Sequence, residues 1–189
     1  MYIEKIVVGP VETNCYILSK DENAEDVIVV DPGGEAEKIK EKIGGRKIKA
    51  VLLTHGHFDH TGALYAFKDY PIYINKNDEK MLSDPSLNAG YLINDSAARP
   101  NATNFYKDGD VIEIAGLSIA VLETPGHTMG SVSLICGKNI FTGDTLFDGD
   151  YGRVDLPGGS MEMMKQSLKR LFGFAGYKAY PGHGPNATI

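Results

Sequence analysis

Apolar residues along the chain gather into short runs rich in Val and Ile, first near the N-terminus and again in the second half. Such runs, bounded by Gly, Pro, Asp and Asn, are typical of β-strands. The pattern predicts strands at residues 3–8, 14–19, 26–31, 47–54, 71–74, 111–115, 117–124, 131–136 and 139–144, and a short one at the start of 178–185.

Helical spacing of apolar residues marks two longer segments. Residues 35–42 place Ala36, Ile39 and Ile43 on one stripe, and the glycines at 44 and 45 end the helix. The second segment follows Ser160, its expected N-cap, and its stripe is expected to be core packing by Met161, Met164, Leu168, Leu171 and Phe172. A further short helix is expected over residues 61–67.

Residues 76–110 are more polar and are interrupted by Pro85, Gly90 and Pro100. They are expected to hold a helix around residues 78–82 and otherwise a loop or lid that shapes the binding pocket. Two β-rich halves with helices between and after them predict an α/β sandwich of αββα type, with two mixed sheets face to face and helices on both outer faces. Residues 1–189 are expected to form a single domain.

Composition narrows the class of protein. The chain is 42% apolar and 23% charged, with a net charge of −6, which is ordinary for a soluble protein and argues against a nucleic-acid-binding surface. No run approaches the roughly 20 apolar residues of a membrane span, and the N-terminus does not have the pattern of a secretory signal. Cys15 and Cys136 lie in apolar stretches, which predicts buried thiols and a cytoplasmic protein. No pattern determines the oligomeric state.

The motif HGHFDH at residues 55–60 supplies three imidazoles and a carboxylate directly after a predicted buried strand. Each unpaired buried polar group costs about 1–3 kcal/mol, so this cluster is poor core material. Imidazole and carboxylate are ligands of zinc and iron. The spacing lets His55 and His57 converge, whereas Asp59 and His60 can point to a different centre as the next helix begins.

The two remaining histidines, His127 and His183, each follow Pro-Gly at the end of a predicted strand, and Asp144 follows a strand in FTGDTLF. No histidine is left for an exposed surface, because the chain contains only five. This confinement predicts a shared role. Seven ligands exceed what one tetrahedral zinc takes, so two metal ions are expected.

Together these motifs resemble those of the metallo-β-lactamase-fold hydrolases. The resemblance rests on DPGG at 31–34, HGHFDH at 55–60, PGHT at 125–128, TGDTLF at 142–147, GRVDLPGGS at 152–160 and PGHG at 181–184. Within the superfamily the chain is most similar to short, single-domain proteins of the glyoxalase II (hydroxyacylglutathione hydrolase) type. The resemblance implies the metallo-β-lactamase fold and hydrolysis of a small acyl thioester such as S-lactoylglutathione.

The resemblance also implies a role for each residue of the cluster. His55, His57 and His127 are expected to bind one ion, and Asp59, His60 and His183 are expected to bind the other. Asp144 is expected to bridge the two ions. A hydroxide between the ions is expected to attack the substrate carbonyl, with Asp59 as the catalytic carboxylate that orients it. Zinc is the expected metal, with iron or manganese as alternatives.

Three further residues are candidates for supporting roles. Asp31 is expected either to orient a ligand histidine or to make the DPGG turn. Arg153 either contacts an anionic substrate or forms a structural ion pair, which is the favoured interpretation. Tyr151 is a candidate for the pocket wall.

Several alternative functions use the same residues. A persulfide dioxygenase would need one iron on His55, His127 and Asp144. A lactone or β-lactam hydrolase would use the dinuclear site unchanged. A non-catalytic metal protein is disfavoured, because closed structural zinc sites favour cysteine. The long glyoxalase II enzymes bind glutathione through a C-terminal helical region, and this sequence ends six residues after His183. The thiol that carries the acyl group is therefore not assigned to glutathione.

Overall fold

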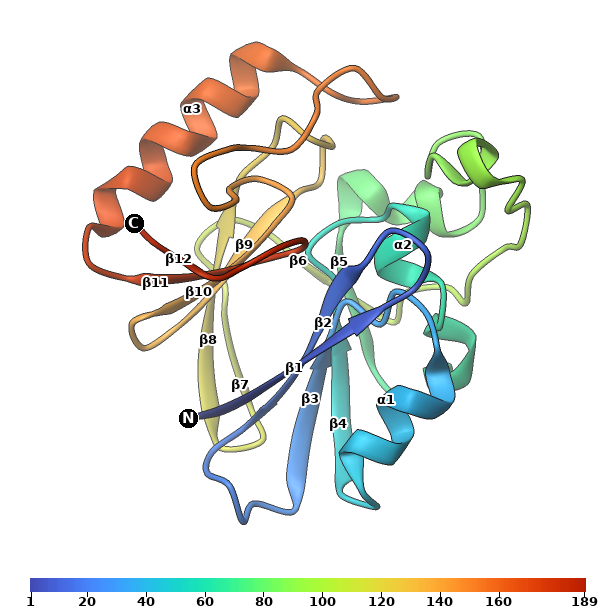
Figure 1. Cartoon of the computed structure of the whole chain (residues 1–189), viewed down its shortest axis with the longest axis vertical. Coiled ribbons are helices and arrows are strands. Elements are labelled where there is room, and N and C mark those ends of the chain that lie inside the picture. The colour runs from blue at the N-terminus through green and yellow to red at the C-terminus, as the bar shows by residue number, and fades with distance from the viewer.

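The computed structural model describes residues 1–189, and its strands form two six-stranded sheets (Figure 1). The first sheet is ordered β1-β2-β3-β4-β5-β6: Tyr2–Val8, Thr13–Ser19, Asp26–Val30, Lys47–Leu52, Ile72–Asn75 and Asn104–Tyr106. The second is ordered β12-β11-β10-β9-β8-β7: Ala187–Thr188, Lys178–Pro181, Asn139–Gly143, Val132–Cys136, Leu117–Glu123 and Val111–Ile114. Both sheets are mixed, as predicted, since β3 to β6 run parallel to one another and β10 runs parallel to β11.

Three apolar layers hold the sheets and helices together. The layer between the sheets contains Leu52 of β4, Leu134 of β9 and Phe141 of β10. A second layer packs α1 (Ala36–Ile43) on the outer face of the first sheet, and a third packs α3 (Met161–Leu171) on the outer face of the second. Figure 1 shows these helices on opposite sides of the molecule. The arrangement confirms the predicted αββα sandwich, which is the metallo-β-lactamase fold.

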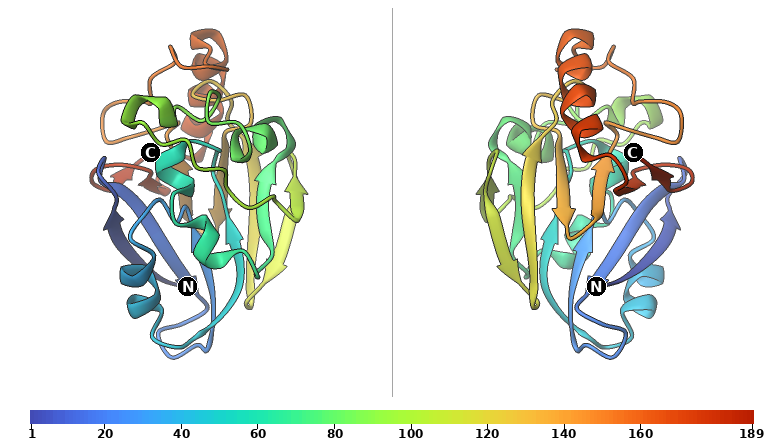
Figure 2. Two further views of the ribbon diagram at one scale, coloured as in Figure 1. Left: turned by 90° about the vertical axis from the view of Figure 1, so that its right-hand side faces the viewer. Right: turned by 90° about the vertical axis from the view of Figure 1, so that its left-hand side faces the viewer.

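Several strands that matter for function end at the same edge of the sandwich. β9 is antiparallel to both β8 and β10, and β11 is parallel to β10, so β8, β10 and β11 run in one direction. The turn after β8 and the short helix α2 (Phe58–Thr61) that follows β4 both lie at the upper end of the sheets (Figures 1 and 2). The predicted motifs that follow these strands are thereby brought to one edge.

The helix predicted over residues 61–67 is present only in part. α2 begins earlier, inside the HGHFDH motif, and a separate 3-10 turn, η1, follows at Leu64–Phe67. The Thr61 hydroxyl donates to the carbonyl of His57 at 2.9 Å, which closes α2 after one turn. The early start places Asp59 and His60 on helical backbone, so their side chains leave the chain in different directions.

Residues 76–110 contain more regular structure than the sequence predicts. The helix expected at 78–82 is present as the 3-10 helix η2 (Lys76–Leu82), and a second short one, η3, covers Gly90–Ile93. Strand β6 adds three residues to the edge of the first sheet and was not predicted. Neither was β12, which has only two residues.

The apolar stripe predicted on α3 is only partly buried. Met164 and Leu171 are fully buried, but Met161 and Phe172 are 38% and 59% exposed, and Phe172 belongs to the terminal turn η4 (Phe172–Phe174). The inner face is centred closer to Ser167, whose hydroxyl donates to the carbonyl of Pro125 at 2.6 Å. The predicted N-cap is confirmed, because the Ser160 hydroxyl accepts from the Met163 amide. α3 therefore supports the turn that carries His127.

The remaining expectations for the scaffold concern the thiols and the membrane. Cys15 and Cys136 are buried and unpaired, as predicted. None of the helices combines the length and the apolar character that crossing a bilayer requires.

Phe141 tests the importance of the layer between the sheets. Its ring lies 5.2 Å from that of Tyr16 and 5.1 Å from that of Tyr180. Phe141→Ala should lower the free energy of unfolding by about 3–5 kcal/mol, because a large cavity would be left there. The exposed Phe172 is the matched control, and Phe172→Ala should cost less than about 1 kcal/mol. Urea denaturation measures both, and equal losses would contradict the assignment of the main core.

Candidate metal centre

Seven imidazole and carboxylate side chains converge at the edge where the strands end. His55 and His57 lie on the extended segment between β4 and α2, and Asp59 and His60 lie on α2. The other three follow strands of the second sheet, because His127 is in the turn after β8, Asp144 comes directly after β10 and His183 follows β11. All except Asp59 and His183 are buried, and those two are partly buried.

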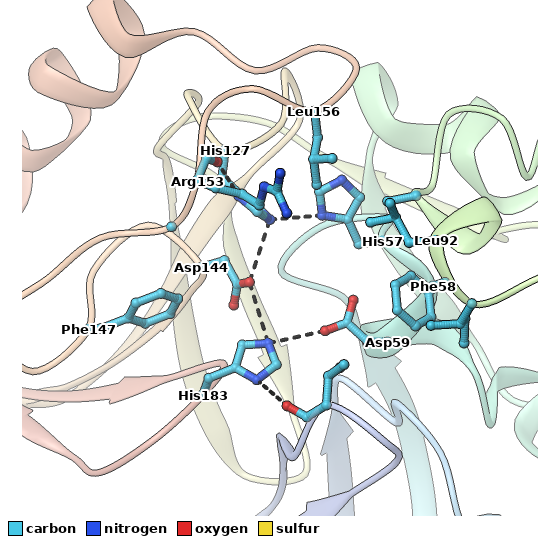
Figure 3. A pocket seen from close by; sticks show the side chains of 14 residues that line it. His57, Phe58, Asp59, Leu92, His127, Asp144, Phe147, Arg153, Leu156 and His183 are labelled. Atoms are coloured by element: carbon cyan, nitrogen blue, oxygen red, sulfur yellow. Dashed lines mark hydrogen bonds and ion pairs between the residues drawn. The ribbon is translucent and has the colours of Figure 1, made fainter.

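The side chains form compact groups that share members. Ligand atoms lie within 4.8 Å of one another in each of three groups: His55, His57 and His127; His55, His60 and Asp144; and Asp59, His60 and His183. Asp144 lies between the first and third groups, since its carboxylate is 3.5 Å from Nε2 of His127, 3.5 Å from Nε2 of His183 and 3.3 Å from Nε2 of His60. Figure 3 shows Asp144 between His127 and His183.

Hydrogen bonds at the outer nitrogen of three rings determine which nitrogen faces the cluster. Nδ1 of His60 donates to the Asp31 carboxylate at 2.9 Å, Nδ1 of His127 to the carbonyl of Arg153 at 2.7 Å, and Nδ1 of His183 to the carbonyl of Val11 at 3.0 Å. An imidazole that donates from Nδ1 carries a lone pair on Nε2 when it is neutral. Each of these rings can therefore present a ligand nitrogen to the cluster, in the manner of histidines that bind metals.

Four buried atoms of the cluster have no hydrogen-bond partner. They are Nε2 of His55, Nε2 of His57, Nε2 of His60 and Oδ1 of Asp144. A buried polar atom without a partner costs about 1–3 kcal/mol, and native proteins contain few of them. A bound cation would satisfy Nε2 of His55 and of His60 and the Asp144 oxygen together, so the residues fit a metal centre.

The electrostatic environment differs between the two halves of the cluster. Burial lowers the pKa of His57 to about 3, with nearby His127 acting in the same direction, and burial also holds the pKa of His55 well below its usual range. Burial opposes ionisation of Asp144, but His60 and His183 outweigh it and hold the pKa of this carboxyl well below its usual range. In the other half, burial is outweighed by hydrogen bonds to Asp144 and Asp59, which raise the pKa of His183 to about 9, and by nearby carboxylates, which raise the pKa of His60. Metal binding requires neutral imidazoles and an ionised carboxylate, so it would displace protons from these two rings.

The three supporting candidates occupy different places. Asp31 lies behind the cluster, where its carboxylate accepts from the Thr54 amide at 2.8 Å, the Thr54 hydroxyl at 2.7 Å and His60. The guanidinium of Arg153 forms two hydrogen bonds with Asp155, which lower the pKa of that exposed carboxyl to about 2. The carbonyl of Arg153 accepts from His127, and Arg153 also lines the pocket over the cluster.

Tyr151 differs from its expected position. It borders a separate hollow beside Phe172 and the C-terminal residues, whereas the pocket over the cluster is lined by other residues. The reason is local, because the amide of Phe147 donates to the carbonyl of Asp150 at 2.8 Å and closes a turn just before Tyr151.

Two polar residues that contact the motifs were not identified from the sequence. The Thr13 hydroxyl donates to Asp59 at 3.1 Å, and the buried Asp78 carboxylate accepts from groups on two histidine-bearing loops. Neither belongs to a motif with a distinctive spacing. Only the pairing of distant segments brings them to the site.

A pocket of about 290 Å³ opens over the cluster. Its floor includes His57, Asp59, His127, Asp144 and His183, and its walls are largely apolar. Figure 3 shows Phe58 and Leu92 on one side of the cluster and Phe147 on the other. The expectation that the segment 76–110 shapes the pocket is met by Ala89, Leu92 and Ile93. The pocket brings an apolar group of a small molecule next to the polar cluster.

Comparison with known proteins identifies the class of protein that this fold and site define. The family model of the metallo-beta-lactamase superfamily matches residues 8–183. The chain belongs to this superfamily of metallo-hydrolases. It is 38% identical to an uncharacterized protein of Aquifex aeolicus, over 90% of this chain and 83% of that protein. It is 35% identical to the probable metallo-hydrolase YqgX of Bacillus subtilis, over 98% of this chain and 91% of that protein. It is also 35% identical to the hydroxyacylglutathione hydrolase GloC of Haemophilus influenzae, over 89% of this chain and 83% of that protein.

Solved structures show the same relationship. The BLEG-1 B3 metallo-beta-lactamase superposes with a TM-score of 0.93 at 32% identity, covering 99% of this chain and 94% of that one. TTHA1623, solved in a di-iron-bound form, superposes with a TM-score of 0.85 at 33% identity, covering 98% of this chain and 94% of that one. ETHE1 from Myxococcus xanthus superposes with a TM-score of 0.76 at 26% identity, covering 100% of this chain and 80% of that one.

Replacement of Asp31 tests whether its carboxylate holds the cluster in place. Asp31→Ala would leave three donors without their acceptor and would put Ala at a φ of 50°, so the free energy of unfolding of the metal-free protein should fall by about 3 kcal/mol or more. Asp31→Asn should cost less, because Asn keeps one acceptor oxygen and tolerates this backbone. Urea denaturation compares them, and a loss below about 1 kcal/mol for both would contradict the role.

Proposed function

We propose that this metallo-hydrolase cleaves small acyl thioesters with a dinuclear metal centre. The observation that supports the proposal is the convergence of seven imidazole and carboxylate side chains, five of which form the floor of a largely apolar pocket. The hydroxyacylglutathione hydrolase GloC, a thioester hydrolase by its name, matches this chain along most of its length and supports the choice of reaction.

In the proposal the seven side chains form two sites with a shared carboxylate. One site consists of His55, His57 and His127, and the other of Asp59, His60 and His183. Asp144 belongs to both, because its carboxylate lies between His127 and His183. The carboxylates of Asp59 and Asp144 supply negative charge that a pair of divalent ions needs.

When bound, a pair of divalent ions would polarise the substrate carbonyl and lower the pKa of water toward about 7. The residues of the chain then have defined tasks. Asp59, whose carboxylate is oriented by Thr13 and lies 3.1 Å from Nε2 of His183, is placed to orient the attacking water. Phe58 and Leu92 exclude bulk water on one side of the cluster and contact an apolar part of the substrate.

The identity of the metal is part of the proposal. Imidazole and carboxylate ligands without thiolates suit zinc, iron and manganese. Zinc is proposed as the working metal, and iron is the main competitor, because TTHA1623 was solved with two iron ions.

A mononuclear iron centre on His55, His127 and Asp144, as in a persulfide dioxygenase, is the second candidate. The likeness to ETHE1 is the observation in its favour. It would leave four of the seven side chains without a ligand role, including Asp59 and His183, whose ligand atoms are 3.1 Å apart. The dinuclear hydrolase accounts for more of the cluster and is therefore preferred.

The reaction is tested with purified, zinc-loaded protein on a panel of S-lactoylglutathione, a neutral acyl thioester, a lactone and nitrocefin. Thioester cleavage should exceed the other two reactions. Oxygen uptake on glutathione persulfide by an iron-loaded sample without thioester cleavage would contradict the proposal and support the dioxygenase. Preferred cleavage of the lactone or of nitrocefin would retain the dinuclear site but contradict the substrate class.

His127→Ala tests the ligand assignment within the same assay. It should reduce zinc from two ions per chain to one and lower kcat/KM by about 100-fold or more, which is the upper end of the loss caused by removing a supporting contact. Phe172→Ala serves as the control, because Phe172 is exposed and does not line the pocket over the cluster, and it should retain both ions and the activity. Unchanged zinc content in His127→Ala would remove this residue from the metal centre.

A further inference from the structure

Asp78 is a buried carboxylate outside the seven ligating residues, and its position follows from the strand order. It lies on η2, directly after β5, and β5 runs parallel to β4. The carboxyl ends of these neighbouring strands therefore meet at the same edge of the first sheet. The Asn75 side chain caps η2 by accepting from the Asn77 amide, which brings Asp78 beside the segment that follows β4.

The Asp78 carboxylate accepts hydrogen bonds from two separate loops. Its Oδ2 accepts from the Gly56 amide at 3.1 Å, and Gly56 lies between two histidines of the motif. The same oxygen accepts from the Thr128 hydroxyl at 2.6 Å, and Oδ1 accepts from the Gly130 amide at 2.7 Å. Only 1% of Asp78 is exposed, so water cannot replace these contacts without opening the structure.

Both glycines are needed for this close approach. A Cβ on Gly130 would lie 2.6 Å from Cγ of Asp78, and a Cβ on Gly56 would lie 2.7 Å from Cβ of Met81 on the same 3-10 helix. Since real Cβ atoms are not found at such distances, larger residues would separate the loops from η2. The two histidine-bearing loops and η2 are thus built to meet at the Asp78 carboxylate.

The loops joined by Asp78 carry one specific group of imidazoles. Gly56 separates His55 from His57, and Thr128 follows His127, so these three histidines are the members of the first compact group. Asp31 acts on the other side of the centre, because it holds His60. Each half of the centre is therefore held by its own buried carboxylate.

We infer that Asp78 is a positioning residue that fixes the separation of the His55, His57 and His127 rings and thereby sets the affinity of this group for a divalent cation. It joins the two loops at their main-chain amides and does not touch the cation. The inference rests on the proposed function only in that the three imidazoles bind a metal ion.

Asp78→Asn is the informative substitution. An amide has one acceptor oxygen, so Asn can accept from the Gly56 amide or from the Gly130 amide but not from both. Asp78→Ala removes all three contacts. Asp84→Asn is the matched control, because Asp84 lies in the same segment and is exposed, and its carboxylate accepts hydrogen bonds only from Ser86. His127→Ala provides the reference for loss of the three-imidazole site.

The measurement is zinc affinity of metal-stripped protein, by competition with a chromophoric chelator, together with urea denaturation in the absence of metal. Asp78→Asn should weaken one of the two zinc sites by about tenfold or more, and Asp78→Ala should weaken the same site further. The remaining site should keep its affinity, as in His127→Ala, and Asp84→Asn should match the wild type.

If both zinc sites kept their wild-type affinity in the two Asp78 variants, Asp78 would have a merely structural role and the inference would be overturned. A loss of stability of the metal-free variants would not change that conclusion. Equal weakening of both sites would overturn it as well. If Asp78→Ala does not fold, Asp78→Asn decides. A wild-type protein that binds no zinc would contradict the proposed function, whereas a wild type with two sites and unaffected variants contradicts only the inference.

Discussion

The burial of ligating imidazoles and carboxylates at one edge of the sandwich is the constraint on which the rest of the structure depends. Nε2 of His55, of His57 and of His60, and Oδ1 of Asp144, are buried without a partner inside the protein. In an apolar core such atoms would destabilise the fold, because each has lost its hydration. A divalent ion would satisfy Nε2 of His55, Nε2 of His60 and the Asp144 oxygen, and its binding would also stabilise the folded chain.

The scaffold meets this constraint by fixing the ligands from behind. Main-chain carbonyls of Val11 and Arg153 and the carboxylate of Asp31 accept from the outer ring nitrogens. Val11 and Asp31 adjoin strands of the first sheet, and Arg153 lies in the loop after Asp144, which follows a strand of the second. Asn14 joins the sheets directly, since its side-chain amide donates to the carbonyl of Pro181 at 2.9 Å. A centre made from two sheets therefore depends on the apolar layer that keeps them together.

Local patterns were sufficient to predict most strands, the αββα layers and the seven residues that converge, because strands and motif spacing are local properties. The errors lie where distant contacts decide. β6 is three residues long and exists by pairing with β5. Asp78 was missed as part of the site because its partners are 22, 50 and 52 residues away and two are main-chain amides.

In the proposed function, one chain holds two divalent ions in a shared centre. The deciding experiment is metal analysis of purified protein that has been stripped with a chelator, reloaded with zinc and freed of excess metal. Two zinc ions per chain and a rise in the thermal unfolding midpoint on reloading are expected. A protein that retains one ion or none, or that unfolds at the same temperature with and without zinc, would contradict the proposed function.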